Sequence, residues 1–330
     1  MRTPASDMRS FFSLLVLSVY AMFPVSAVMA QAYPVKPVRL IVGYTPGGGA
    51  DTTARLAAQK LSEVLGRQVI VENRPGASGT IATERVATAP PDGYTLLLMT
   101  TGDTVQPALR TKLPYDLQRD LAPVSLLTVG PFALTTHPSV PARNIKELIV
   151  LARKDPGKLS FGSSGVGASP HLAAELFKSV AGINIMHVPY KGGSDAIVAT
   201  ASGQIDMSFT TITAALPLLG AGKLKALAVT TNQRASLLPA VPTMSESGLS
   251  GYSYSVWYGV LTASATPADV IGRLNAAIVK VVNTPEMKEA LNKQGLEPQT
   301  STPKEFAAFI RSEVVQNAKL IKLADVKPEP

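Results

Sequence analysis

Short apolar segments alternate with amphipathic patterns along most of the chain, and this alternation constrains the fold more than any other feature. The segments predicted as strands include Val38–Val42, Val69–Glu72, Tyr94–Met99, Ser125–Val129, Phe132–Thr136, Lys158–Phe161 and Leu224–Val229. Helical patterns lie between them, near Asp51–Leu65, Thr80–Ala87, Ile145–Lys154 and Pro170–Ala181. Such a rhythm is typical of α/β domains, in which helices cover both faces of mainly parallel sheets.

The last part of the chain has a different pattern, which indicates how the domains are organised. An extended stretch, Tyr254–Leu261, precedes three helices, each with a proline at its start: Pro267–Asn283, Pro285–Gln294 and Pro303–Lys322. Two segments resemble crossings between lobes, Thr128–Thr136 and Tyr252–Leu261. Two crossings predict a discontinuous first lobe, residues 31–131 and 255–330, and an inserted second lobe, residues 132–254. The cleft between the lobes is then the expected ligand site.

The N-terminus has the pattern of a secretory signal peptide. Arg2 and Arg9 precede an apolar run, Phe11–Phe23, and small residues follow up to Ala30. A membrane-spanning helix needs about 20 apolar residues, whereas Pro24 interrupts this run. We expect residues 1–30 to be removed. Because the chain has no cysteine to carry a lipid, the mature protein is expected to be free in the periplasm of a two-membrane bacterium.

Composition excludes several classes of site. The 330 residues include no cysteine, so disulfides, thiolate metal sites and cysteine nucleophiles are excluded. Charged residues make up 16%, below the roughly 25% of average globular chains, which argues against disorder or a nucleic-acid coat. The net charge of +8 identifies no ligand by itself. The three histidines, His137, His171 and His187, have no metal-binding spacing, so neither a metal nor a cofactor is expected.

Two glycine-rich loops are the strongest candidates for ligand binding. Tyr44–Asp51 (YTPGGGAD) follows a predicted strand and opens a predicted helix, where backbone N–H groups and the helix N-terminus suit a carboxylate or phosphate. A tight turn with Asp51 as the helix N-cap is the plainer interpretation. Gly162–Ser169 (GSSGVGAS) occupies a similar position in the second lobe. The sequence has neither the P-loop pattern nor G-x-S-x-G in these loops, and no acid pair or Ser/His/Asp order is visible, which argues against an enzyme.

At this point the motifs resemble those of a known family. Pro46-Gly47-Gly48-Gly49-Ala50-Asp51, Val71–Gly79 (VENRPGASG), Pro91–Thr95 (PDGYT), Leu113–Asp116 (LPYD), Tyr190–Gly193 (YKGG) and Trp257–Gly259 (WYG) occur in order along the mature chain. Pro242-Thr243 and Glu246-x-Gly248 are further landmarks. Together they are similar to the Bug-type extracytoplasmic substrate-binding proteins of tripartite tricarboxylate transporters.

The resemblance implies a two-lobed fold of the periplasmic binding protein type (type II-like) that closes on a small organic ligand, commonly a carboxylate. It also implies two integral-membrane transporter subunits as partners; we expect a monomer that binds no nucleic acid. The ligand contacts that it implies are Tyr44, Pro46, Gly47, Gly48, Gly49, Asp51, Thr101 and Asp103 in the first lobe, with Ser163, Ser164, Gly167, Ala168, Ser169, Tyr190, Lys191, Gly192, Asp206 and Ser208 in the second.

Asp103 departs from the family pattern. A carboxylate facing the cleft would repel a second ligand carboxylate or pair with an amine; alternatively, Asp103 caps the short helix that follows it. A ligand sensor for signalling, an enzyme on the same scaffold and a secreted adhesion module remain alternative functions, because a fold alone does not determine function.

Overall fold

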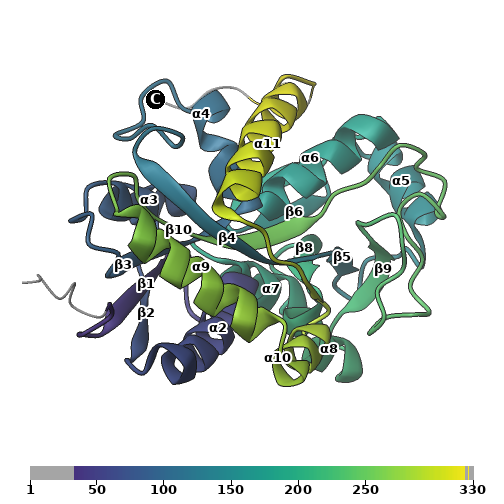
Figure 1. Cartoon of the computed structure of the whole chain (residues 1–330). Helices are drawn as coiled ribbons and strands as arrows, with labels where there is room; N and C mark the ends of the chain where they lie inside the picture. Colours follow the sequence, from purple (N-terminus) through teal and green to yellow (C-terminus); the bar gives the residue numbers. More distant parts are fainter. Residues whose placement is uncertain (1–32, 324–325, 327–330) are drawn as a thin grey trace, which may run out of the picture. The chain divides into compact units, whose positions relative to one another are not determined.

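Two mixed sheets, each flanked by helices, form the architecture of the chain (Figure 1). The computed structural model describes residues 33–323 and residue 326, so the predicted signal peptide lies outside the described residues. The described residues from Pro34 onward belong to one compact unit. The two-lobed α/β fold expected from the strand–helix alternation is confirmed.

The first sheet contains six strands in the order β11–β4–β10–β3–β1–β2. Their bounds are β1 Val38–Val42, β2 Val69–Asn73, β3 Thr95–Thr100, β4 Leu121–Gly130, β10 Val256–Ala263 and β11 Glu297–Pro298. The pairs β1–β2 and β1–β3 are parallel, whereas β10 is antiparallel to both β3 and β4. Four strands therefore run in one direction, and β10 and β11 run in the other.

The second sheet repeats this plan with five strands in the order β7–β6–β8–β5–β9. Their bounds are β5 Phe132–Thr136, β6 Ser160–Ser163, β7 Met186–Pro189, β8 Met207–Thr211 and β9 Lys225–Val229. Only β5 is antiparallel to its neighbours. In each sheet most strands therefore run in the same direction, as the expectation of mainly parallel sheets requires. In each sheet a strand that has just crossed from the other lobe, β10 or β5, runs against its neighbours, and in the first sheet the two-residue β11 does so as well.

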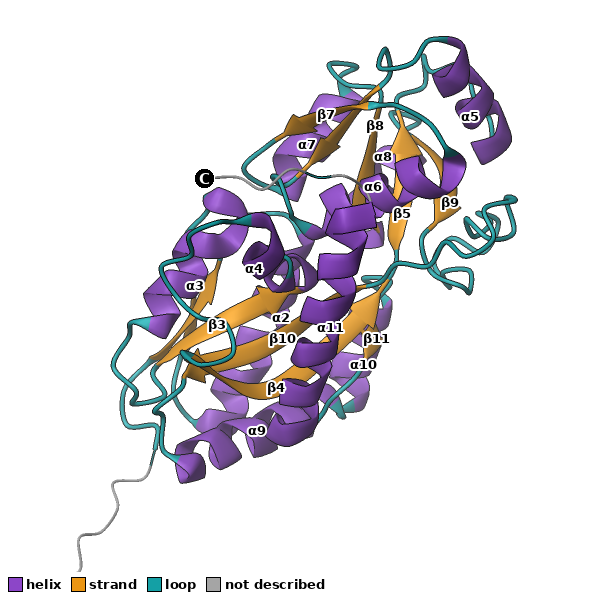
Figure 2. Cartoon of the chain, turned by 90° about the horizontal axis from the view of Figure 1, so that it is seen from above, coloured by secondary structure: helices purple, strands orange, loops and turns teal. Residues whose placement is uncertain are grey.

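Helices cover both faces of the sheets (Figure 2). Their bounds are α2 Gly49–Leu65, η1 Ala77–Gly79, α3 Thr80–Ala87, η2 Thr101–Thr104, α4 Gln106–Leu109, α5 Ile145–Lys154, α6 Ser169–Ala181, α7 Gly193–Ala201, α8 Ile212–Gly220, α9 Ala268–Val282, α10 Pro285–Asn292 and α11 Pro303–Leu323. Helices α2 and α9 pack on one side of the first sheet, and α3 and α11 on the other. No helix within the described residues combines the length and apolar character needed to cross a membrane.

The core of the first lobe lies between its sheet and helices α3 and α11. Alternate strand residues such as Ile41, Leu97 and Trp257 point into it, as expected for strands whose side chains alternate between faces. The Trp257 ring packs edge-on against Phe306, with 5.7 Å between ring centroids, and its Nε1 donates a hydrogen bond to Glu313 at 2.7 Å. These contacts hold α11 against the strand that carries Trp257.

The two segments that cross between the lobes lie side by side. In the first, β4 ends at Gly130 and β5 begins at Phe132, and Gly130 pairs with Val256 at the start of β10. Thr230 joins the segments on the second-lobe side, because its N–H donates to the Phe132 carbonyl (3.0 Å) and its carbonyl accepts from Tyr254 N–H (2.9 Å). The crossings thus form a short two-stranded hinge.

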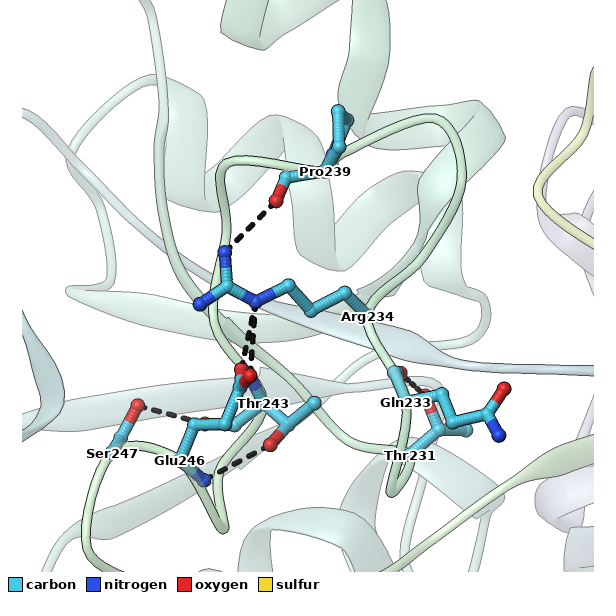
Figure 3. Close-up of polar contacts among 7 residues, drawn as sticks. All are labelled: Thr231, Gln233, Arg234, Pro239, Thr243, Glu246 and Ser247. Carbon is cyan, nitrogen blue, oxygen red and sulfur yellow. Dashed lines mark hydrogen bonds and ion pairs between the residues drawn. The ribbon is translucent and has the colours of Figure 1, made fainter.

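A polar cluster shapes the long connection that leads from β9 back to the hinge (Figure 3). The Arg234 guanidinium donates to the Glu246 carboxylate (2.9 Å) and to the Pro239 carbonyl (3.0 Å). Glu246 also accepts from Thr243 N–H at 2.8 Å, while its own N–H donates to the Thr243 hydroxyl. These bonds lower the pKa of Glu246, with the Thr243 N–H as the main cause and Arg234 next. The landmark residues Thr243 and Glu246 therefore have a structural role here.

The core contact around β10 gives a stability prediction. A methyl group added at Gly259 would overlap the ring of Phe306, which is fully buried beside Trp257 and has little room to move. We expect Gly259→Ala to lower the free energy of unfolding by about 1–3 kcal/mol, as overpacking does, in urea denaturation. Gly272→Ala in α9 is the control, because nothing lies near its added methyl. Equal stability of Gly259→Ala and wild type would contradict this account.

Candidate functional site

A cavity of ≈ 60 Å³ lies between the two lobes. It is built from strand ends and the starts of the helices that follow them, the usual place for ligands in open α/β sheets. Residues of both sheets line it: Tyr44, Gly48, Gly49, Ala50, Thr100, Val256 and Tyr258 from the first lobe, and Phe132, Ser164, Ser169, Pro170, Gly193, Phe209, Thr210, Thr211 and Ala214 from the second.

Four helices begin at this cavity, namely α2, α6, α7 and α8. Their N-cap residues are Gly48, Ala168, Gly192 and Thr211, and none of these four described residues makes a side-chain capping hydrogen bond. By contrast, α5 and α10, which begin elsewhere, are capped by Asn144 and Thr284. The first N–H groups of a helix have no partner inside the helix and carry partial positive charge. The cavity therefore presents donors suited to an anion.

Three hydroxyl groups add hydrogen-bonding capacity that the protein itself does not use. Ser164 is 7% exposed, Thr211 8% and Tyr258 3%, and all three line the cavity. Within the described part of the chain, none of the three hydroxyls has a hydrogen-bond partner. Because these hydroxyls line the cavity and no protein group occupies them, they are available to pair with a ligand or with water.

The cavity holds no charged side chain among the described residues that line it. Much of its wall is apolar or aromatic, with Phe132, Phe209, Val256 and Ala214 contributing from the strands and α8. Binding of an anion here depends on backbone dipoles and hydroxyls rather than on a salt bridge. Such groups are fixed in place, so they lose little freedom when a ligand arrives.

Asp51 holds the first glycine-rich loop in shape. It is not the N-cap, as one interpretation of the sequence had it, because α2 begins two residues earlier and the N-cap is Gly48. Its carboxylate reaches back to Gly47 N–H (2.9 Å) and also accepts from Asn73 and Arg55. Burial alone would raise the pKa of Asp51, but these hydrogen bonds hold it below its ordinary value. Gly47 itself has a φ of 82°, which favours glycine.

Asp103 lies behind the cavity wall and does not line it. Its carboxylate accepts from the N–H (2.7 Å) and hydroxyl (3.1 Å) of Thr100, and the Thr100 hydroxyl in turn accepts from Gly102 N–H. This reciprocal capping box closes the start of η2, so the capping alternative describes Asp103 and the repulsion argument does not apply. Burial raises the pKa of Asp103 to about 6 despite these hydrogen bonds.

Two stacked histidines contact residues of the second glycine-rich loop. The rings of His171 and His187 lie 4.1 Å apart between centroids. His187 Nε2 is 2.7 Å from the Ser163 hydroxyl, and His171 Nδ1 accepts from Gly167 N–H at 2.9 Å. Burial, followed by the nearby His171 and Lys178, lowers the pKa of His187 to about 3. Through Ser163 and Gly167 the two histidines thus hold the loop in place, and Ser164, the residue after Ser163, lines the cavity.

Several hydrogen bonds join the lobes around the cavity, so the described structure is a closed form. Gly102 N–H donates to the Ser169 hydroxyl (2.9 Å), and the Ser78 hydroxyl donates to the Val166 carbonyl (2.6 Å). The hydroxyls of Thr45 and Ser194 lie 3.0 Å apart. Each bond pairs a loop of the first sheet with a loop of the second, so opening the cleft would break all of them.

The other residues implied by the family resemblance have varied positions. Of the eighteen, Tyr44, Gly48, Gly49, Ser164 and Ser169 line the cavity. Pro46 lies in the exposed part of the first loop, Thr101 binds the backbone of Ser255 and Trp257, and Ala168 is the N-cap of α6. Gly192 packs against Thr45, and Tyr190 and Lys191 border a neighbouring pocket.

Asp206 and Ser208 lie away from the cavity. The Asp206 carboxylate accepts from the N–H and hydroxyl of Ser160, at the end of β6 and β8 opposite the cavity. Ser208 is enclosed within its lobe by Thr135 and Thr200. Position along the strand explains the difference, because the cavity is formed by the last residues of β8, Thr210 and Thr211, whereas Asp206 precedes the strand and Ser208 lies near its start.

Sequence reasoning missed the strand ends that complete the cavity. Thr100 ends β3 and Thr211 ends β8, which occupy the same position in the two sheets. Both are in hydroxyl-rich stretches, Thr100-Thr101 and Thr210-Thr211, each followed directly by a helix. A Thr-Thr pair at a strand–helix junction is the sequence signal by which they could have been found. Phe132 and Tyr258, by contrast, are brought in by the crossing segments; Tyr258 lies in the Trp257–Gly259 motif, but that motif was not assigned to ligand binding.

The fold and site define a two-lobed α/β binding protein with its ligand site at the interface of the lobes. Residues 53–326 match the family model of the tripartite tricarboxylate transporter family receptor, and the chain belongs to this family. The matched family is a receptor family, and structural neighbours such as BugD are periplasmic binding proteins, which places the chain with binding proteins rather than enzymes.

Individual relatives agree with this assignment. BugT of Bordetella pertussis is 34% identical over 302 residues, covering 91% of this chain and 93% of BugT, so the Bug-type resemblance is confirmed. The structure of Rpa4515 from R. palustris with adipate has a TM-score of 0.87 and 34% identity, covering 90% of this chain and all of Rpa4515. MatC from Rhodopseudomonas palustris with bound malate has a TM-score of 0.83 and 30% identity, covering 88% of this chain and all of MatC.

The low pKa of His187 gives a pH prediction. Below pH 6.5 the unfolded chain protonates this residue, whereas the folded protein keeps it neutral down to about pH 3. The contribution of His187 to the free energy of unfolding is therefore lost as the pH falls below 6.5. We expect the wild-type free energy of unfolding to decrease relative to that of His187→Gln between pH 7 and pH 4, by on the order of 1 kcal/mol per pH unit.

The comparison isolates His187, because the raised pKa of Asp103 acts with the opposite sign in both proteins and cancels. Glutamine keeps an amide near the position of Nε2, so the contact with Ser163 can be retained. Denaturant titrations at four pH values measure the difference, and parallel stability curves for the two proteins would contradict the prediction.

Proposed function

We propose that this protein is a periplasmic solute receptor that binds a small organic carboxylate between its lobes, closes on it and delivers it to two integral-membrane subunits of a tripartite tricarboxylate-type transporter. The site residues are those that line the cavity. The carboxylate is held by the N-termini of α2, α6, α7 and α8 and by the hydroxyls of Ser164, Thr211 and Tyr258.

The observation that carries this proposal is the combination of uncapped helix starts and unpartnered buried hydroxyls around one uncharged cavity. Helix N–H groups and hydroxyls at its wall can donate hydrogen bonds to an anionic ligand. The carboxylates bound by relatives, adipate in Rpa4515 and malate in MatC, support the same class of ligand. The family assignment and the signal-peptide pattern support the transport role and the location.

The direct test of this function is to identify the natural ligand. Mass spectrometry of small molecules released by denaturing the purified native protein is expected to yield an organic acid. Isothermal titration calorimetry with a panel of mono- and dicarboxylates is then expected to show binding in the micromolar range or tighter. Recovery of a neutral sugar or a metal ion, or turnover of the bound acid, would overturn the proposal.

Two tyrosine variants separate binding from stability. Tyr258→Phe removes a hydroxyl that lines the cavity and has no partner in the described protein, so we expect it to weaken carboxylate binding about fivefold to tenfold without loss of stability. Tyr252→Phe is the matched control, because its hydroxyl donates to the Ala173 carbonyl (2.9 Å) inside the second lobe. This control should lose about 1 kcal/mol of stability and keep its affinity. Unchanged affinity in Tyr258→Phe would remove this hydroxyl from the site.

Lobe closure can be tested at Gly192. A methyl group at this position would overlap the Thr45 hydroxyl of the opposite lobe, while its extended backbone (φ −164°) accepts alanine. Gly192→Ala is therefore expected to hinder closure and reduce carboxylate affinity at least tenfold, with the melting temperature of the free protein unchanged. Gly220→Ala, in the same lobe with open space around it, should bind like wild type. Wild-type affinity in Gly192→Ala would show that tight binding does not require this closed form.

A further inference from the structure

A second space, of about 570 Å³, lies against the hinge, and we call it the hinge groove. Residues of both lobes and of the crossing segments line it, among them Asn292 and Gly295–Glu297 of the first lobe, Thr231–Ser236 of the second, and Pro131 and Ser255 of the crossings. The next residues along the crossings, Phe132 and Val256, line the ligand cavity instead. The hinge therefore borders both spaces.

The hinge groove and the mouth of the cleft lie on opposite sides of the hinge. The hydrogen bonds that hold the mouth closed come from Thr45, Ser78 and Gly102, in the loops after β1, β2 and β3. In the first sheet these strands lie on one side of β10 and β4, and β11, which carries part of the groove wall, lies on the other. In the second sheet β6 and β7 lie on one side of β5, and β9, which leads into the other wall, is at the opposite edge (Figure 2).

This arrangement makes the two spaces change in opposite directions. A rotation about the hinge that separates the loops at the mouth moves the groove walls toward each other, because the walls belong to different lobes and lie beyond the axis of rotation. Conversely, closing the lobes on a ligand widens the groove. The volume of the hinge groove therefore belongs to the closed form.

Both walls of the groove are held in shape by their own lobes. On the second-lobe wall, the Arg234 guanidinium donates to the Glu246 carboxylate at 2.9 Å (Figure 3). On the first-lobe wall, Glu297 pairs with Val129 in the sheet, and its carbonyl accepts from the Thr128 hydroxyl at 2.5 Å. Because the walls are fixed within their lobes, a group placed between them resists the approach of the lobes.

We propose that the hinge groove controls lobe closure: a group that fills it keeps its walls apart, disfavours the open form and thereby strengthens ligand binding in the cavity. This inference rests on the lobe closure of the proposed function, and not on which ligand is bound. The groove and the cavity are distinct sites that are coupled through one hinge. Because apparent affinity rises with the fraction of protein in the binding-competent form, an occupant of the groove strengthens binding without touching the ligand.

Single thiols test this coupling, because the chain has no cysteine and a maleimide modifies only the one that is introduced. Ser236→Cys and Asn292→Cys place a thiol at exposed positions on the two walls of the groove. Each variant is labelled with N-ethylmaleimide or with the larger N-(1-pyrenyl)maleimide, and its affinity for adipate and for malate is measured by isothermal titration calorimetry. Labelling either variant should strengthen binding about threefold or more, with the larger gain from the pyrene.

Ser202→Cys is the matched control, because Ser202 is an exposed serine of the second lobe outside both the groove and the cavity. Its affinity should not change on labelling. If the labelled groove variants bind no more tightly than the labelled control, or bind more weakly than before labelling, the groove does not control closure and the inference is overturned.

Small-angle X-ray scattering on the free proteins gives a second measurement that needs no ligand. Pyrene-labelled Ser236→Cys should have a smaller radius of gyration than the unlabelled variant, because the closed form is the more compact one; an unchanged radius would contradict the inference. If neither acid binds to the wild-type protein and its released ligand is not an acid, the proposed function fails, and the scattering comparison still decides the inference. Melting temperatures show whether each labelled variant is folded.

Discussion

The pairing of the two crossing segments is the constraint on which the rest of the structure depends. Gly130 pairs with Val256, and Thr230 binds both Phe132 and Tyr254 through its backbone. These bonds place a crossing strand antiparallel to its neighbours in each sheet, β10 and β5, and hold both sheets at a common hinge. Because the crossing strands enter between the third and last parallel strands, the helix-starting ends of both sheets meet at one interface. The cavity is a consequence of this arrangement.

The lack of charged side chains among the described residues of the cavity wall determines which groups can bind a ligand there. Asp51 and Asp103 are held in hydrogen bonds behind the wall, shaping the loops instead of facing the ligand. His171 and His187 perform a similar task under the second loop. With charges kept behind the wall, uncapped helix starts and hydroxyls are left to face the ligand. Fixed dipoles in a partly dry cavity act strongly on an anion because there is little water to screen them.

Much of the fold could be predicted from local patterns. The strands Val38–Val42 and Phe132–Thr136 have the predicted bounds, and most other strands and helices differ by a few residues at their ends. The short elements η1 and β11 were not predicted, whereas a short helix after Asp103 was, and the hydrogen bonds between Asp103 and Thr100 close the start of η2. Both glycine-rich loops contribute to the cavity, whereas Asp206 and Ser208 do not.

The sequence by itself determined the α/β class and the glycine-rich loops that start helices at the cleft, because these depend on residue types that act over a few positions: glycine in tight turns, proline in first turns, and apolar periodicity. Only the tertiary structure decided that Tyr258, Phe132 and Thr211 share one cavity. These residues are far apart in the chain. Their meeting depends on strand order and lobe closure, which no local pattern encodes.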